Sequence, residues 1–260
     1  RRVLLLERAG RIKPCGGAIP PQAMRDFDIP DSQLVAKVTK ARMISPTGQA
    51  VDIPINGGFV GMVDRGPFDE WLRERARAAG ATRRTGTFEA LERDEQGVAV
   101  IRYKTEDGAE AKVKARAVVG ADGAKSQVGL QAVPGADKMK FVFAYHEFVA
   151  TPAAAPEGYE ADRCDVYYDG ALSPDFYAWV FPHGGTISIG TGTEVKGFSM
   201  RQAVADLRAR IGLDTAETLR HEGAPIPLEP LKRWDNGRDV LLAGDAAGVV
   251  APASGEGIYY

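Results

Sequence analysis

Short apolar runs followed by an acidic residue recur three times in the pattern of hydrophobic and polar positions. The runs occupy residues 3–6, 117–120 and 240–243, and the acids that follow them are Glu7, Asp122 and Asp245. Continuous apolar runs of this length are typical of parallel strands buried on both faces. Because nucleotides bind at the carboxyl ends of such strands in open α/β sheets, the three acids are candidate nucleotide ligands.

Helical periodicity predicts two longer helices. The first begins near Pro67, has acids in its first turn and ends at Gly80, and the second spans residues 199–211. A further helix is expected to begin near Ser254. Apolar residues at helical spacing predict one buried face on each long helix: Phe68, Trp71, Leu72, Ala76 and Ala79 on the first, and Met200, Ala203, Val204, Leu207 and Ile211 on the second.

Strand and turn patterns fill residues 38–63, 81–115 and most of 137–232. The three strand-and-acid segments are therefore separated by β-rich stretches. This order predicts an α/β fold with a β-rich insertion, in which a discontinuous Rossmann-like nucleotide-binding domain accompanies a substrate domain of antiparallel sheet. The predicted boundaries are residues 1–36, 64–136 and 233–260 for the first domain, and 37–63 and 137–232 for the second.

Composition excludes several classes of protein. The chain has 33 Lys and Arg against 35 Asp and Glu, a net charge of −2, so no overall basic field favours nucleic acid. No uninterrupted apolar run reaches the roughly 18 residues of a membrane span. Cys15, Cys164 and three scattered histidines fit neither a disulfide framework nor a four-ligand zinc site, so we predict no metal and a reducing, cytoplasmic setting.

Glu7 is a candidate ligand for a ribose, because a carboxylate can accept both neighbouring hydroxyls. A solvated loop acid is the alternative interpretation. The G-x-G-x-x-G turn expected about 20 residues upstream is not in the chain, which begins at Arg1. We therefore expect a first strand and its phosphate-binding helix to precede Arg1, the chain to stop inside the helix after Gly255, and this piece alone to hold its cofactor poorly.

A stronger signal for cofactor binding than Glu7 comes from the segment around Asp245, which reads Leu241-Leu242-Ala243-Gly244-Asp245-Ala246-Ala247. Small residues around Asp245 let a flexible polyol and a pyrophosphate approach backbone N–H groups, and the aspartate can accept a ribityl hydroxyl. Gly255 and Gly257 follow in a glycine-rich segment suited to the pyrimidine edge of a flavin. Asp122-Gly123 repeats the pattern after the middle strand. The alternative for a bare Gly-Asp is an aspartate that caps a helix.

In order and spacing, the three acid motifs resemble the flavin-binding set of the p-hydroxybenzoate hydroxylase-like flavoproteins. The resemblance implies FAD as the cofactor and makes the first predicted domain an FAD-binding domain. It also implies that Arg65, in the segment Val63-Asp64-Arg65-Gly66-Pro67-Phe68-Asp69, lies beside the cofactor. A surface arginine flanking a helix is the alternative for Arg65.

Two further segments resemble the signatures of geranylgeranyl reductases, and of the bacteriochlorophyll and chlorophyll branch in particular. They are Lys13-Pro14-Cys15-Gly16-Gly17-Ala18 and Tyr177-Ala178-Trp179-Val180-Phe181-Pro182. The resemblance implies that Cys15 is catalytic beside the flavin, that Lys13, Gly16 and Gly17 contact the cofactor, and that the aromatic residues line an isoprenoid channel.

On a strand, Tyr177, Trp179 and Phe181 point to one face and would form an aromatic wall. Without the resemblance, such alternation is ordinarily core, and a lone cysteine such as Cys15 is ordinarily a small buried hydrophobe. His183 could donate a proton, although a histidine held by a backbone bond is the simpler interpretation.

The resemblance further implies NADPH as a transient electron donor. The substrate would be geranylgeranyl diphosphate or a pigment bearing a geranylgeranyl chain, reduced stepwise to phytyl, with peripheral attachment to the membrane that holds it. The alternatives are an aromatic hydroxylase or halogenase of the same fold, a reductase of archaeal-type diether lipids, and a non-catalytic flavin or isoprenoid carrier.

Overall fold

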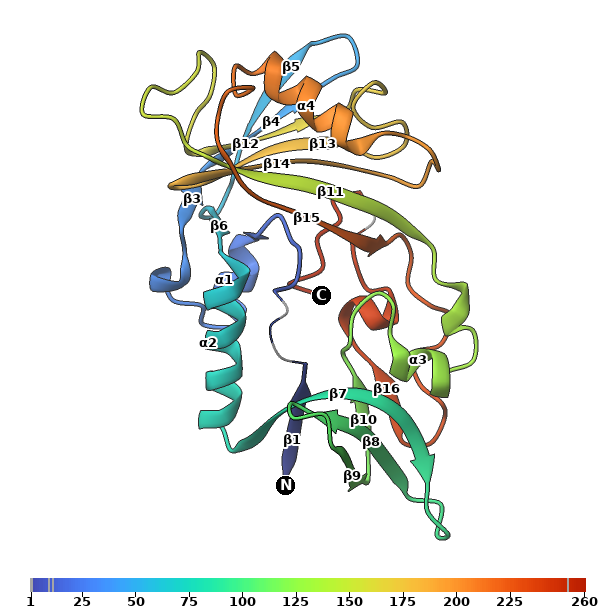
Figure 1. Ribbon diagram of the computed structural model, residues 1–260. Helices are drawn as coiled ribbons and strands as arrows, with labels where there is room; N and C mark the ends of the chain where they lie inside the picture. Colours follow the sequence, from blue (N-terminus) through green and yellow to red (C-terminus); the bar gives the residue numbers. More distant parts are fainter. Residues whose placement is uncertain (1, 9, 11, 252) are drawn as a thin grey trace.

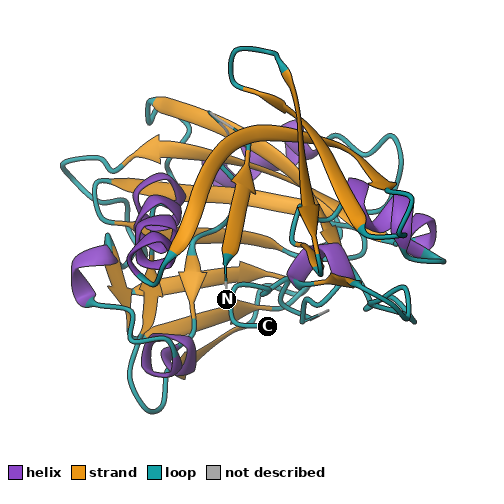
Figure 2. Ribbon diagram, turned by 90° about the horizontal axis from the view of Figure 1, so that it is seen from below, coloured by secondary structure: helices purple, strands orange, loops and turns teal. Residues whose placement is uncertain are grey.

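A computed structural model describes residues 2–8, 10, 12–251 and 253–260 (Figure 1). Arg1, Ala9, Arg11 and Pro252 lie outside the described residues. Strands make up most of the regular secondary structure of the described residues, and the helices are fewer and short (Figure 2).

The largest sheet has seven strands in the order β15-β11-β14-β13-β12-β4-β5. Its pairs are antiparallel except β12 and β4, which run parallel. The strands are β4 (Lys40–Ile44), β5 (Ala50–Pro54), β11 (Phe141–Ala150), β12 (Arg163–Tyr167), β13 (Ala178–His183), β14 (Thr186–Thr193) and β15 (Thr218–Pro227).

Three smaller sheets make up the rest of the β structure. A four-stranded sheet has the order β1-β7-β8-β9, with β1 and β7 parallel, and β10 pairs with β16 in parallel. A third sheet has the order β2-β6-β3. These strands are β1 (Val3–Glu7), β2 (Ala18–Ile19), β3 (Ala36–Val38), β6 (Val60–Met62), β7 (Ala81–Arg93), β8 (Ala99–Thr105), β9 (Glu110–Ala115), β10 (Val118–Gly120) and β16 (Val240–Leu242).

The α-helices are α1 (Pro21–Asp26), α2 (Arg65–Ala78), α3 (Gln127–Ala132) and α4 (Met200–Arg210). Single 3₁₀ turns occupy Asp31–Gln33, Ala136–Lys138 and Gly244–Ala247. The predicted α/β fold with a β-rich insertion is confirmed. The larger sheet draws strands from both segments of the predicted substrate domain, but β2 pairs with β6 across a predicted boundary, and the boundaries themselves stay a prediction.

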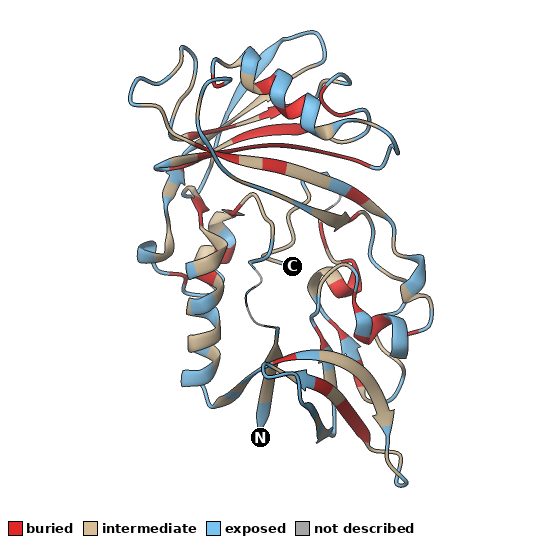
Figure 3. Ribbon diagram, in the orientation of Figure 1, coloured by how far each residue is buried: buried red, intermediate tan, exposed pale blue. Residues whose placement is uncertain are grey.

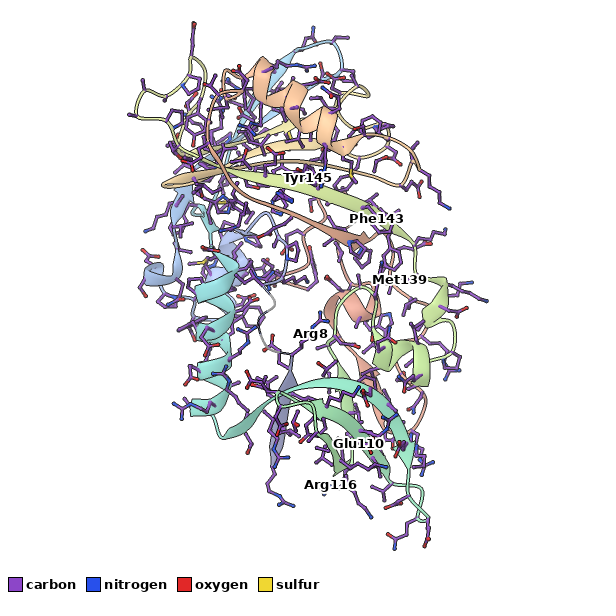
Figure 4. All side chains as sticks on the ribbon, in the orientation of Figure 1. Arg8, Glu110, Arg116, Met139, Phe143 and Tyr145 are labelled. Carbon is purple, nitrogen blue, oxygen red and sulfur yellow. The ribbon has the colours of Figure 1, made fainter. Side chains whose placement is uncertain are left out.

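Helix α4 covers one face of the seven-stranded sheet (Figure 3). Alternate residues of β13 and β14 point to it, and Tyr145 of β11, labelled in Figure 4, packs against the same cluster. This buried cluster includes Ala178, Val180, Ile187, Ile189, Ala203, Val204 and Leu207. The predicted buried face of the second helix is confirmed at Ala203, Val204 and Leu207.

Several sequence predictions about local structure are wrong. No helix begins at Ser254: residues 253–255 form a turn closed by a bridge between Ala251 and Glu256, and Gly255 has a left-handed φ of 66°, which does not continue a right-handed helix. Helix α2 begins at Arg65 rather than at Pro67. Two residues predicted on its buried face, Leu72 and Ala79, are exposed, whereas the polar Arg65 and Asp69 are largely buried.

The short strands β10 and β16 are not buried on both faces. Val119 and Leu241, paired side by side, are 61% and 52% exposed, because the same face of both strands is open to solvent. Val3 at the start of β1 is also exposed. The apolar runs therefore predicted the parallel strands correctly, and in these 260 residues one face of β10 and of β16 is open.

Gly190 of β14 lies where the side chains of the neighbouring strands meet. A methyl group there would overlap the Trp179 ring and would lie 2.5 Å from the His146 Cβ. Overpacking of this kind costs about 1–3 kcal/mol. We expect Gly190→Ala to lower the free energy of unfolding by that amount in urea denaturation.

Gly185, in the turn between β13 and β14, is the matched control, because a Cβ there would meet nothing within 4 Å. Gly185→Ala should change the free energy of unfolding by less than about 0.5 kcal/mol. Equal effects of the two substitutions would show that the close approach at Gly190 is not real.

Candidate functional site

Lys13 and Asp245, 232 residues apart in sequence, form an ion pair of 2.6 Å between Nζ and Oδ2. Lys13 lies in the loop after β1, and Asp245 lies just beyond the carboxyl end of β16. A methyl group at Gly257 would lie 3.3 Å from the other carboxylate oxygen of Asp245. Three sequence motifs predicted to bind the cofactor therefore meet at one place, and Asp245 does not cap the turn that contains it.

Cys15 and Arg65 come together on the side of this loop that faces α2. The Cys15 sulfur accepts a hydrogen bond from the Gly17 amide at 3.3 Å. Arg65 donates to both carboxylate oxygens of Asp69, at 2.8 and 3.0 Å. Although burial alone would lower the pKa of Arg65, the neighbouring Cys15 and Asp69 raise it above its ordinary value.

The remaining nitrogen of Arg65, Nη1, is buried and has no hydrogen-bond partner among the described residues. An unsatisfied buried donor costs free energy unless a ligand or an ordered water accepts from it. The carbonyl oxygens and ring nitrogens of a flavin are acceptors of the required kind. The donor set around Cys15 therefore fits the flavin that the sequence predicts.

Tyr177, Trp179 and Phe181 lie on the face of the large sheet opposite α4. Their rings are neighbours, with centroids 5.9 Å apart for Tyr177 and Trp179 and 6.1 Å apart for Trp179 and Phe181. A methyl group at Gly16 would lie 3.3 Å from the Phe181 ring, and the Tyr177 hydroxyl donates to the Ser254 carbonyl.

Burial raises the pKa of Tyr177, and the nearby Tyr168 and Cys15 add to the rise. We refer to Tyr177, Trp179 and Phe181 as the aromatic wall. The wall packs against the loop that carries Cys15 and, through Tyr177, against the turn near Gly255. The neighbouring Phe176 also contacts that turn, since its ring would lie 3.3 Å from a methyl group added at Gly255.

Gly17 is required by packing within the protein. It has a φ of 73°, and a methyl group there would overlap the Val63 carbonyl and lie 2.7 Å from Nε2 of His183. His183 is buried, and its Nδ1 lies 3.2 Å from the Phe181 carbonyl. Because a carbonyl only accepts, Nδ1 carries the hydrogen, as the backbone-held interpretation of His183 requires. A cofactor contact at Gly17 stays a prediction.

Ser126 is the N-cap of helix α3, and Asp122 supports the same turn. The Asp122 carboxylate accepts from the backbone amides of Gln127 and Val128, at 2.7 and 3.1 Å, and from the Ser126 hydroxyl. Asp122 is therefore engaged with the start of a helix, which is close to the capping alternative considered for Asp245. Gly123 and Gly244, at φ of 87° and 57°, have open space where a side chain would be, so a ligand could approach the backbone at both strand ends.

Glu7 is held by Arg73 of α2, which donates to both of its carboxylate oxygens. This bond raises the pKa of Arg73. Glu7 and Arg73 line a cavity of about 660 Å³ between β1, α2 and β7, together with Arg8, which follows Glu7 in the chain and is labelled in Figure 4. The ribose role of Glu7 stays a prediction, in which Arg73 would share the carboxylate.

Arg73 and Asp69 are site residues that the sequence reasoning missed. Arg65, Asp69 and Arg73 are spaced four residues apart and therefore lie on one face of α2. Charged residues that recur at this spacing beside the predicted apolar face are the sequence signal by which Asp69 and Arg73 could have been found.

Neither a membrane-spanning helix nor a metal site appears in the part of the chain that the structure describes. None of its helices is long and apolar enough to cross a membrane. None of its groups of His, Cys, Asp and Glu is arranged to hold a metal ion.

Comparisons with known proteins show the family of the chain. Residues 36–259 match the family model described as "FAD binding domain". The chain is 62% identical over its whole length to geranylgeranyl diphosphate reductase of Rhodobacter capsulatus and covers 66% of that protein. It is 38% identical over 99% of its length to the chloroplastic geranylgeranyl diphosphate reductase of Oryza sativa, and covers 58% of it.

The chain thus spans less than two thirds of the length of these relatives. Among solved structures, it resembles a geranylgeranyl bacteriochlorophyll reductase-like protein of Thermoplasma acidophilum, with a TM-score of 0.85 and 19% identity. That comparison covers 99% of this chain and 74% of the other. The chain therefore belongs to the FAD binding domain family and, within it, to the geranylgeranyl reductases.

Proposed function

We propose that this chain is part of an FAD-dependent reductase that uses NADPH to saturate the double bonds of a geranylgeranyl chain. The observation that carries the proposal is the packing of the Cys15 loop against the aromatic wall. In this proposal the predicted cofactor contacts and the aromatic rings that would line the prenyl site stand on two sides of one cysteine, with Tyr177 and Trp179 themselves buried.

The cofactor would be held by the groups that converge on this loop. Lys13 and Asp245 would contact it from one side, Gly244 leaves open space for a close approach, and Arg65 would offer Nη1, which has no partner among the described residues. Gly16, Gly255 and Gly257, whose side-chain directions are filled by neighbouring protein atoms, would contact the cofactor through their backbone. Glu7, Asp122 and Gly123 stand at the other strand ends. When bound and reduced, FAD supplies the hydride for the reduction.

An isolated prenyl double bond has no neighbouring carbonyl to accept the charge of an added hydride. A proton must therefore arrive before or together with the hydride, and positive charge develops on the tertiary carbon. The aromatic wall would hold the chain and exclude water from it. The proton would come from Cys15 or from a water held beside it.

His183 is a poor proton source in this arrangement. Burial is the main cause that lowers its pKa to about 4, so it is neutral near pH 7. Its Nδ1 hydrogen is already donated to the Phe181 carbonyl, and Nε2 has no partner among the described residues. In this proposal the proton comes from the Cys15 loop and not from His183.

The substrate would be geranylgeranyl diphosphate or a chlorophyll-type pigment that carries a geranylgeranyl chain, as in (bacterio)chlorophyll biosynthesis. Such a chain resides in a membrane, so the protein would meet it by peripheral attachment. NADPH would bind transiently as the electron donor, as the resemblance to these flavoproteins implies.

The full-length protein, loaded with FAD, tests this function with NADPH and each prenyl substrate under anaerobic conditions. We expect the product mass to rise by two hydrogens for each NADPH oxidised. A stabilised hydroperoxyflavin on rapid mixing of the reduced protein with oxygen, with an aromatic product that gains oxygen, would support a hydroxylase or halogenase instead. Saturation of diether lipids alone would indicate the archaeal-type activity, and no NADPH oxidation would indicate a carrier.

Cys15→Ala should lower turnover of the prenyl substrate by about a hundredfold or more, the contribution of a positioned proton donor, without loss of bound FAD. Cys164→Ala is the matched control. Cys164 is buried, and burial raises its pKa to about 12, so the thiol stays protonated and its removal should leave turnover unchanged. Unchanged turnover in Cys15→Ala would remove the thiol from the proposed chemistry.

The low pKa of His183 makes stability depend on pH. The unfolded histidine takes up a proton near pH 6.5, whereas the folded one does so only near pH 4. The contribution of His183 to the free energy of unfolding is therefore fully present above pH 6.5 and is lost as pH falls toward 4. This difference corresponds to about 3 kcal/mol. Urea denaturation of the wild type and of His183→Phe should show this loss in the wild type only. Parallel curves for the two proteins would contradict the assignment.

A further inference from the structure

One row of residues crosses four strands on the face of the sheet opposite α4. Trp179 of β13 is paired with Gly190 of β14, Gly190 with His146 of β11, and His146 with Glu222 of β15. Gly190 has no side chain, so the Trp179 indole reaches over β14 toward the imidazole, with ring centroids 6.0 Å apart.

Ser188 connects the two rings. It lies two residues before Gly190, on the same face of β14, and its Oγ is 3.2 Å from Nε1 of Trp179 and 3.0 Å from Nδ1 of His146. On its far side, Nε2 of His146 lies 3.2 Å from a carboxylate oxygen of Glu222. Ser188, His146 and Trp179 are all buried, with exposed fractions of 0%, 3% and 5%.

The chemistry of the groups gives these bonds a direction. The indole N–H of Trp179 can only donate, so the Ser188 oxygen accepts from it. Ser188 can then give its own hydrogen to Nδ1 of His146, which leaves the imidazole hydrogen on Nε2 to be donated to Glu222. In this arrangement each polar side-chain atom of the three buried residues has a partner, which a buried polar network requires to be stable.

Arg220 anchors the carboxylate at the end of the row. Its Nε lies 3.0 Å from Oε1 of Glu222, outside hydrogen-bonding geometry, so the contact is an ion pair. The guanidinium covers the Phe148 ring at 3.7 Å and reaches Asp64 at 3.4 Å, directly before Arg65. Burial alone would raise the pKa of Glu222, but the bond from His146 and the charge of Arg220 lower it, so the carboxylate is ionised at neutral pH.

A serine, a histidine and a glutamate in contact also suggest a nucleophilic triad. Ser188 does not fit that role, because its side chain is fully buried and its oxygen already accepts from Trp179. A nucleophile must be reached by its substrate. What the three residues can do is fix the indole at the other end of the row.

We propose that Glu222, His146 and Ser188 form a positioning relay that fixes the orientation of Trp179 in the aromatic wall and thereby sets the affinity of the wall for a prenyl chain. The effect on affinity rests on the function proposed above, whereas the direction of the hydrogen bonds does not. Ser188, His146 and Glu222 are positioning residues in this account, because none of them touches the substrate.

The tautomer of His146 tests the relay without any substrate. Nitrogen-15 NMR of the wild-type protein should show His146 with its hydrogen on Nε2 and with Nδ1 as an acceptor. The signal is assigned by comparison with His146→Gln. A hydrogen on Nδ1 would overturn the proposal, whatever reaction the protein catalyses.

Ser188→Ala removes the link between the two rings. We expect the indole N–H signal of Trp179, assigned with Trp179→Phe, to lose its hydrogen-bonded shift. We also expect KM for the prenyl substrate to rise about fivefold, the equivalent of one net hydrogen bond, with a smaller change in kcat.

Thr191→Val is the matched control. Thr191 is equally buried on the same strand, but it points to the opposite face and donates to the Leu172 carbonyl at 2.7 Å. It should leave both the indole signal and KM unchanged. If Ser188→Ala moves neither quantity, or if both variants move them equally, the relay does not position Trp179. If the indole signal moves but no prenyl substrate is reduced, the relay stands and the proposed function fails.

Discussion

The site depends on how closely the loop after β1 can approach the seven-stranded sheet. Gly17 makes that approach possible, because any side chain there would overlap the Val63 carbonyl and press on His183. Gly16 also lies close to the sheet, since a methyl group there would lie 3.3 Å from the Phe181 ring. With both glycines in place, Cys15 lies between the aromatic wall and Arg65, and Lys13 reaches Asp245 from the far end of the sequence.

The two faces of the seven-stranded sheet have different chemistry, and the difference follows from what covers each one. The face under α4 is mainly aliphatic, with Ile187, Ile189 and Leu207 at its centre and tyrosines such as Tyr145 and Tyr167 packed with them. The opposite face carries aromatic rings together with buried polar groups such as Ser188 and His146. Buried polar groups are costly unless every one is bonded, and on this face the bonds run along a row set by strand register. The sheet therefore buries mainly aliphatic side chains on one face, and aromatic rings together with bonded polar groups on the other.

Much of this arrangement could be predicted from local sequence. Alternation at Tyr177, Trp179 and Phe181 predicted their common face, and the apolar runs before Glu7, Asp122 and Asp245 predicted the parallel strands. Contacts between distant segments could not be predicted in the same way. The bond from Arg73 to Glu7 and the row from Trp179 to Glu222 depend on helix placement and strand register, which no local pattern encodes. The turn at Gly255 was misjudged because a glycine and a serine suit a helix start as well as a turn.

The central claim is that a prenyl chain and a flavin meet at Cys15, with the aromatic wall on the prenyl side. A crystal structure of the full-length protein with FAD and geranylgeranyl diphosphate tests it most directly. The account predicts the prenyl chain along Tyr177, Trp179 and Phe181, on the face of the sheet opposite α4, with the flavin beside Lys13, Asp245 and Arg65. A prenyl chain bound on the α4 face, or in the cavity between β1 and α2, would contradict it.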